Sequence, residues 1–344
     1  MDNLTHTLTA VAISQAGMSR KTRFATVTVI AAANLPDLDV VTWAEGTATY
    51  LHYHRGITHS LLGIFLIGVA AGLAAYALGR KLGPGRKGIP AIAGWLLACG
   101  LLGSASHLLL DFTNSYGVRP FLPFSARWCA WDIMFIIDPV LLFLLAAGLG
   151  VPALFRLISE EVGAGKPAYR TGAIFSLVAM VLLWGVRDIA HRRAVTLLDS
   201  LQFRQENPTR IGAFPSPLNP LAWIGVAETD TTFYVIPVRA LDDQINLDDA
   251  QVFPKPEASP ALDAAAKTTT GTIFLDFARF PWGQVQDFGG SYRVAFRDLR
   301  FAMPGAQSPG FVMTVDLDKD LRVRSESFAF RGPHERQPRS QVSD

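Results

Sequence analysis

The stretch that decides the fold is SLLGIFLIGVAAGLAAYAL, residues 60–78, which contains no charged side chain. A membrane-spanning helix needs ~20 mainly apolar residues, because the hydrocarbon layer is about 30 Å thick and each helical residue rises about 1.5 Å. The segment HRGITHS, residues 54–60, comes directly before it and carries two histidines. The sequence therefore predicts a membrane helix with polar chemistry at its first end.

Three more apolar runs lie further along the chain. Residues 88–110 and 171–186 carry no charge, and residues 133–155 carry one, Asp138, followed by a proline. Two weaker segments, residues 4–18 and 24–35, are apolar but short, so we expect them to span poorly, to be re-entrant or to pack against the bundle. The predicted fold is an α-helical integral membrane bundle with four clear spans plus two short N-terminal helices.

The composition agrees with a membrane protein. Half of the 344 residues are hydrophobic and 17% are charged, against about 25% charged residues in soluble proteins. The net charge of +2 gives no sign of a nucleic-acid partner, and the two cysteines form no CxxC pair. No basic region precedes the first apolar stretch, so we expect no cleaved signal peptide.

Basic residues predict the orientation in a bacterial inner membrane. They gather in the loops 19–23, 79–87 and 156–170, which should therefore be cytoplasmic. The opposite loop ends should face the periplasm. Arg187, Arg192 and Arg193 follow the last span on the outer side and disagree with this pattern.

The chain changes character at about residue 194. Pro215, Pro217 and Pro220 suggest a linker. Four β-rich runs then suggest strands: residues 231–238, 272–280, 292–301 and 311–330, the last with a hairpin turn at 318–320. We expect three parts: a helical membrane domain (1–193), a small soluble mainly-β (α+β) domain (194–330) and a disordered tail (331–344).

Ionisable residues mark one face of the predicted bundle. They are costly in membrane segments and usually have a function there. Four separate segments bring histidine or aspartate to the outer end of the bundle. These residues are His6, Asp37, Asp39, His54, His59, His107 and Asp111.

The spacing of these residues adds detail. His107 and Asp111 are four apart, so both project from one face of a helix. If the backbone after Pro36 is extended, Asp37 and Asp39 point the same way. Gly56 permits a bend that lets His54 and His59 converge, and Thr58 is a candidate cap for the next helix.

A set of imidazoles and carboxylates suits a divalent metal, with zinc first and manganese or iron as alternatives, in one to three ions. Such a centre activates water and clamps a phosphoryl or acyl oxygen. Asp37 or Asp39 could serve as the base, and Arg55 could bind a phosphate oxygen or pair with an aspartate. We expect His52 to be a bystander and Asp138 to be structural.

Three segments also carry a family resemblance: NLPDLD (34–39), HRGITHS (54–60) and HLLLDFTNSYG (107–117). They resemble the signature segments of the YdjM-type inner-membrane metal-dependent hydrolases, a family distantly similar to zinc-dependent phospholipase C and P1 nuclease. The resemblance implies phosphoester hydrolysis. It implies metal ligands at His6, Asp37, His107 and Asp111 with His54 or His59. The chain lacks the later HxxxE segment of the soluble enzymes.

Four functions compete. The first is a membrane-bound hydrolase that cleaves a phospholipid head group or another phosphoester of the envelope. A metal transporter would need polar groups stepping through the bilayer, and the apolar runs have almost none. An intramembrane metalloprotease would need HExxH, which is absent. The fourth is a noncatalytic envelope scaffold, in which the metal staples helices and the β domain binds a partner that the sequence does not identify.

Overall fold

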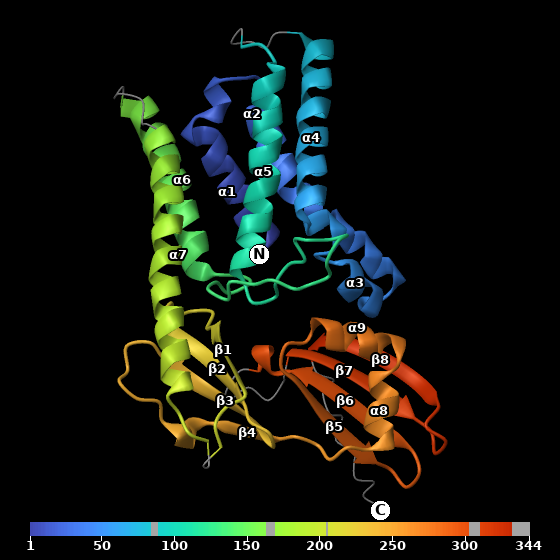
Figure 1. Cartoon of the computed structure of the whole chain (residues 1–344). Coiled ribbons are helices and arrows are strands. Elements are labelled where there is room, and N and C mark those ends of the chain that lie inside the picture. Colours follow the sequence, from blue (N-terminus) through green and yellow to red (C-terminus); the bar gives the residue numbers. More distant parts are fainter. Residues whose placement is uncertain (84–88, 163–168, 204–205, 303–309, 332–344) are drawn as a thin grey trace, which may run out of the picture.

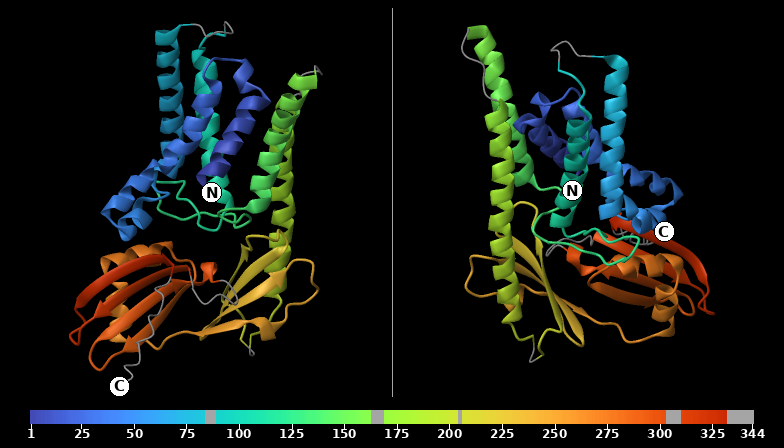
Figure 2. Two further views of the ribbon diagram at one scale, coloured as in Figure 1. Left: turned by 180° about the vertical axis from the view of Figure 1, so that it is seen from behind. Right: turned by 45° about the horizontal axis from the view of Figure 1, so that its top comes forward.

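The computed structural model describes residues 1–83, 89–162, 169–203, 206–302 and 310–331. A bundle of long helices stands on a domain of two β-sheets, and the chain between the fifth and sixth helices crosses the space between them (Figure 1). The two further views show the same arrangement (Figure 2). The predicted tail, 331–344, lies outside the described residues apart from Arg331, which ends the last strand.

The described residues of the N-terminal part form seven α-helices. They are α1 (Asn3–Ala16), α2 (Ala25–Asn34), α3 (Thr47–Tyr53), α4 (Leu61–Leu82), α5 (Ala93–Thr113), α6 (Pro139–Val162) and α7 (Tyr169–Asp199). The 3₁₀ segment η2 (Leu35–Glu45) extends α2, and the short η3 (Ile57–His59) precedes α4. Among the described residues, four helical runs are long and apolar enough to cross a membrane: Ala25–Glu45, Leu61–Leu82, Ala93–Thr113 and Tyr169–Asp199. The predicted fold class is confirmed, but the four spans are not all the predicted ones. Ala25–Glu45 is long enough to cross, whereas the predicted span at 133–155 contains the shorter apolar helix Pro139–Phe155.

Small residues bring α4 and α5 into close contact. A Cβ atom on Gly100 would clash with the carbonyl oxygen of Gly68, so a larger residue at position 100 would force the two backbones apart. Helices in lipid pack through such small residues, because apolar burial gives them no advantage over lipid contact. The packing fixes the end of α5 beside the start of α4.

The predicted span at 133–155 begins later than expected. Residues 133–138 are not helical, and α6 starts at Pro139. Proline is favoured at the first helical position and disfavours helical backbone in the residue before it. Asp138 caps the new helix, because its Oδ1 accepts from the amide of Leu141 at 2.9 Å. Its Oδ2 accepts from Arg187 at 2.7 Å, and both side chains are fully buried. Arg187 is therefore an internal ion-pair partner and not an outer-face surface charge.

The C-terminal part contains two four-stranded antiparallel sheets, each with its strands in chain order. The first has β1 (Arg210–Pro215), β2 (Ala222–Glu228), β3 (Thr232–Arg239) and β4 (Gln251–Pro254). The second has β5 (Pro281–Asp287), β6 (Tyr292–Asp298), β7 (Gly310–Leu317) and β8 (Val323–Arg331). Helices α8 (Pro260–Ala266) and α9 (Thr269–Phe277) pack on the second sheet. The last turns of α7 pack on the first sheet, where Ala194 and Leu198 join the core around Trp223.

Three of the four predicted strands are confirmed, as is the turn at 318–320. The prediction for residues 272–280 is wrong, because most of that run forms helix α9. Thr268 caps this helix by accepting from the amide of Gly271 at 3.0 Å, and Gly271, Phe274 and Phe277 are buried at helical spacing. The expected linker at Pro215 is the end of β1, where Pro215 pairs with Trp223 across a hairpin.

Candidate metal centre

The predicted residues meet at the end of the bundle that faces the β-sheets. His6 lies on α1, Asp37 on η2, His59 just before α4, and His107 and Asp111 near the end of α5. In Figure 1 these ends come together above the chain that crosses between the two parts. His52 is exposed and outside the cluster.

Four side chains form the centre of the cluster: Asp37, His59, His107 and Asp111 offer ligand atoms within 4.8 Å of one another. The Nε2 atoms of His59 and His107 are 3.0 Å apart. The Oδ1 atom of Asp37 lies 3.4 Å from the first and 3.6 Å from the second. The Oδ2 atom of Asp111 lies 3.4 Å and 3.5 Å from them. The four-residue spacing of His107 and Asp111 on α5 thus brings both side chains to the centre of the cluster.

Both central histidines are oriented by their other ring nitrogen. Nδ1 of His107 donates to the carbonyl oxygen of Ala33 at 2.7 Å, which leaves Nε2 free as a lone-pair donor. Nδ1 of His59 lies 3.0 Å from the hydroxyl of Thr58 and 3.3 Å from Oδ2 of Asp39. Metal-binding histidines are usually held in this way. Two Nε2 lone pairs that face each other at this distance repel unless a proton or a metal ion lies between them.

Several buried polar atoms of the cluster have no hydrogen-bond partner in the described part of the chain. They are both ring nitrogens of His6, Oδ2 of Asp37 and Oδ2 of Asp111. The His6 ring stacks on His107 with centroids 3.9 Å apart, and its Nε2 is 3.5 Å from Oδ1 of Asp111. Buried polar groups nearly always have a partner, so orphaned nitrogen and oxygen atoms around one point fit a bound divalent cation.

Asp39 lies beside this centre and contacts the groups around it. Its Oδ1 is 2.8 Å from Nδ1 of His54, and its Oδ2 accepts from the amide of Arg55 at 3.1 Å and from Thr58 at 3.0 Å. Asp37, Asp39 and His54 make a second group of candidate ligands. The backbone here is the 3₁₀ segment η2 and not extended as expected, so the two aspartates approach the cluster from different sides.

Arg55 is buried and forms part of the wall of the cluster. Its backbone is left-handed, with φ of 56°, and its guanidinium lies 4.6 Å from the ring centre of Tyr116. It donates to Oδ1 of Asp111 at 3.1 Å, to Oδ1 of Asn114 at 2.9 Å and to the carbonyl of Gly117 at 3.2 Å. The α-amino group of Met1 also contacts Oδ1 of Asp111.

Sequence reasoning predicted three supporting residues mainly as helix caps: Thr58, Asn114 and Tyr116. Thr58 contacts Asp39 and His59, while Ser60 caps α4 in its place. Asn114 holds Arg55 and does not only end the helix. All three lie inside the quoted segments 54–60 and 107–117, which is the signal that could have found them.

The carboxylates around His59 favour the charged form of its imidazole. Burial disfavours the charged form of His59, but the carboxylates of Asp111, Asp37 and Asp39 outweigh it and raise the pKa of His59 to about 10. The centre therefore favours a cation, either a proton on the imidazole or a metal ion.

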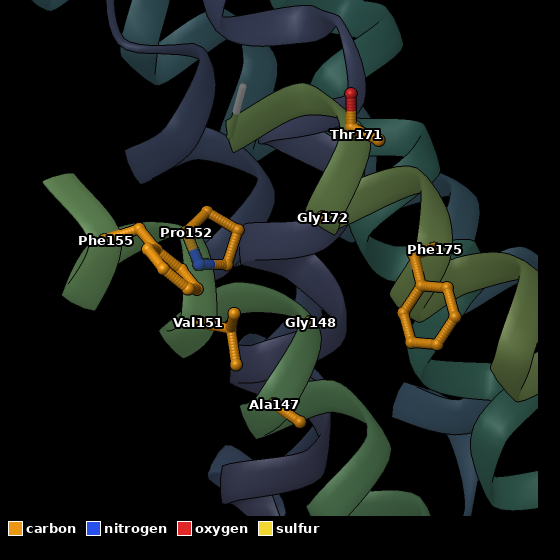
Figure 3. A pocket seen from close by; sticks show the side chains of 8 residues that line it. All are labelled: Ala147, Gly148, Val151, Pro152, Phe155, Thr171, Gly172 and Phe175. Carbon is orange, nitrogen blue, oxygen red and sulfur yellow. The ribbon is translucent and has the colours of Figure 1, made fainter. Parts of the chain in front are cut away.

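A hollow lies between α6 and α7, toward the end of these helices that is farther from the β-sheets (Figure 1). It has a volume of about 550 Å³ and is lined by Gly148, Val151, Pro152 and Phe175, among others (Figure 3). No lining side chain is ionisable, and Thr171 supplies the one hydroxyl among them. This groove therefore offers no group for catalysis and suits contact with lipid chains.

The comparisons with known proteins agree with this picture. The model of the family described as "YdjM inner membrane protein" matches residues 1–194, which include every residue of the cluster. The chain belongs to the YdjM inner membrane protein family. This YdjM family member is also 24% identical to the "Uncharacterized protein YfhP" of Bacillus subtilis (strain 168) over 326 residues, 93% of this chain and 88% of that protein. No solved structure matches the chain.

The family and the four candidate spans make this chain a multi-pass inner membrane protein. The comparisons do not show the expected similarity to phospholipase C and P1 nuclease, which remains a prediction from the sequence segments.

Proposed function

We propose that this YdjM family member is a membrane-embedded, metal-dependent hydrolase that cleaves a phosphoester, such as a lipid head group or an envelope precursor. The observation that carries the proposal is the convergence of His59, His107, Asp37 and Asp111, with orphaned atoms of His6 beside them. A divalent cation held there, zinc first by its donor set, would lower the pKa of bound water and polarise a phosphoryl oxygen.

The side chains divide into ligands and positioning groups. His59, His107 and Asp111 would hold the ion, because their free ligand atoms face the centre. Asp39 would be a positioning residue, since its two oxygens already contact His54, Arg55, Thr58 and His59. Such contacts fix ring orientation and raise the basicity of a ligand.

Arg55 supports Asp111 in this proposal. Both terminal nitrogens of its guanidinium have partners, and its Nε has none among the described residues. Arginine held by three acceptors in a buried position is fixed in place, so it would stabilise the ligand carboxylate and add positive charge beside a bound phosphate.

Asp37 is the best candidate for the base. Its side chain is 14% exposed, whereas the side chains of His59, His107 and Asp111 are fully buried. Its Oδ2 has no hydrogen-bond partner in the described residues. A partly exposed carboxylate beside the centre can orient an attacking water and accept its proton.

Exposed apolar side chains near Asp37 support a lipid substrate. On η2, the neighbours of Asp37 include Leu38, 57% exposed, and Val41, 68% exposed. On η3 and α4, which both contact η2, Ile57 and Leu61 are 50% and 56% exposed. Large exposed apolar side chains in a membrane protein contact acyl chains, so a substrate would reach Asp37 from the bilayer. The distribution of basic residues over the loops predicts that this face is periplasmic.

The second candidate is a structural metal that staples the helices in a noncatalytic scaffold. The nearly complete burial of the centre favours it, because structural sites are closed and catalytic sites keep an open position. The two candidates differ in what Asp37 does: a base is needed for turnover, while a staple needs only ligands.

Hydrolysis by detergent-purified protein tests the proposal. We would measure release of product from a chromogenic phosphodiester and from a fluorescent phospholipid, with wild type, Asp37→Asn and, as a matched control, His52→Gln. The proposal expects turnover that falls by about 100-fold or more in Asp37→Asn, as for loss of a general base, and stays unchanged in His52→Gln. Metal-loaded wild type that hydrolyses neither substrate, but loses thermal stability on chelation, would favour the staple.

A further inference from the structure

A separate cavity of about 310 Å³ lies between the chain that follows α5 and the C-terminal domain. Its walls include Phe112 from α5, Tyr116, Arg127 and Trp128 from the following chain, and Arg279 from the loop before β5. That chain crosses between the end of the bundle and the sheets (Figure 1). The cavity therefore lies at the level where the bundle meets water, which is the level of lipid head groups.

The charges around this cavity leave a positive surplus. Arg279 forms a two-oxygen contact with Asp132, both distances being 2.8 Å. Arg119 lies 4.0 Å from Asp276. Arg127 lines the cavity and has no ion-pair partner in the described part of the chain. One guanidinium is thus available, and arginine is the side chain best suited to binding a phosphate group.

The remaining walls suit a ligand with a polar and an apolar part. Tyr116, Phe112 and Trp128 supply aromatic surface. These rings suit the apolar part of a ligand, and the guanidinium of Arg127 suits its charged part.

The cavity is held in shape by the backbone. Val118 and Cys129 exchange two hydrogen bonds, of 2.9 Å and 2.8 Å, which close the loop between them. This bridge places Arg127, Trp128 and Cys129 along one wall. Further out, Phe121 and Phe124 of the same loop are 49% and 91% exposed, as expected for side chains that enter a membrane interface.

We propose that this cavity binds the phosphate-bearing head group of an anionic lipid, with Arg127 on the phosphate and the aromatic walls against the apolar part of the lipid. The site is distinct from the metal centre, which contributes none of the lining residues. Tyr116 contacts both sites, because it lines the cavity and its ring also contacts Arg55 beside the metal centre. The proposal does not rest on hydrolysis.

Cys129 supplies a reporter for occupancy. It lines the cavity and is partly exposed, while the second cysteine, Cys99, is buried in α5. We would measure the rate at which iodoacetamide labels Cys129, by peptide mass spectrometry on the detergent-purified full chain. The probes are dioctanoyl phosphatidic acid, inorganic phosphate, and dioctanoylglycerol as the lipid without phosphate.

We expect phosphatidic acid at ten times its dissociation constant to slow labelling by about ten-fold. Arg127→Gln should raise the dissociation constant by about ten-fold or more, since hydrogen bonds to a charged group are lost, so protection at the same lipid concentration should fall to about two-fold or less. The matched control Arg239→Gln, an exposed arginine on β3, should leave it unchanged. Protection by inorganic phosphate as well would show that the phosphate alone suffices, and its absence would assign the lipid as the source.

Three results would overturn the proposal: no protection by either phosphate compound, equal protection by dioctanoylglycerol, or full protection in Arg127→Gln. Because the readout is thiol labelling, a failure here would say nothing against hydrolysis at the metal centre. A failure of hydrolysis would equally leave this site standing.

Discussion

Asp39→Asn separates a positioning carboxylate from a metal ligand. Asp39 contacts two imidazoles, with Oδ1 2.8 Å from Nδ1 of His54 and Oδ2 3.3 Å from Nδ1 of His59. Asparagine keeps one acceptor oxygen and replaces the other with an NH₂ group, which donates. Whichever way the amide turns, one histidine then faces a donor and loses its fixed orientation.

The size of the effect decides between the two roles. Loss of an orienting partner weakens metal binding by about 10- to 100-fold, which corresponds to about 1.4–2.8 kcal/mol. Loss of a charged ligand should cost more, and Asp111→Asn provides that reference. We therefore expect Asp39→Asn to bind metal more weakly than wild type and more tightly than Asp111→Asn.

The assay is competition with a chromogenic chelator, on protein purified in detergent. Asp188→Asn is the matched control, because Asp188 also accepts two hydrogen bonds, from Trp131 at 2.8 Å and Arg192 at 2.9 Å, but lies outside the cluster. Equal affinities for wild type and Asp39→Asn, or an equal loss in Asp188→Asn, would refute the reasoning.

Two further predictions follow from buried charges. A metal ion binds the neutral imidazole of His59, and the surrounding carboxylates raise the pKa of this imidazole to about 10. Metal binding therefore displaces a proton. The affinity for the metal should rise by about ten-fold per pH unit between pH 6 and 8. An affinity that stays constant over this range in the same chelator competition would contradict the protonated metal-free centre. Arg187→Met leaves the carboxylate of Asp138 buried and unpaired, so the free energy of unfolding should fall by about 3–5 kcal/mol, measured by denaturation in detergent. The double variant Arg187→Met with Asp138→Asn should recover most of this loss, and a single variant as stable as wild type would show that the pair contributes nothing.

The sequence predicted the bundle well, because long charge-free runs leave few alternatives in a chain this apolar. It was less accurate where local chemistry decides. Pro139 and the cap by Asp138 delay α6 by several residues beyond the start of the apolar run. Residues 272–280 look like a strand from their apolar and β-branched side chains, yet the Thr268 cap and the buried spacing of Phe274 and Phe277 favour a helix.

The residues of the site were predictable from their types, and their arrangement was not. Histidine and aspartate at the ends of four apolar segments indicated one polar face, and the structure brings His6, Asp37, His59, His107 and Asp111 together there. The left-handed turn at Arg55 and the long-range contacts of Asp39 depend on how η2 and η3 pack, which no short segment determines.

The metal content of the purified protein tests the central claim most directly. We would measure it by mass spectrometry, without chelators, for wild type, His107→Ala, Asp111→Ala and, as a control, His52→Ala. The account predicts at least near-stoichiometric divalent metal in wild type and His52→Ala, and its loss in the two cluster variants. Wild type without metal, or cluster variants that keep it, would contradict a metal ion held by His59, His107 and Asp111.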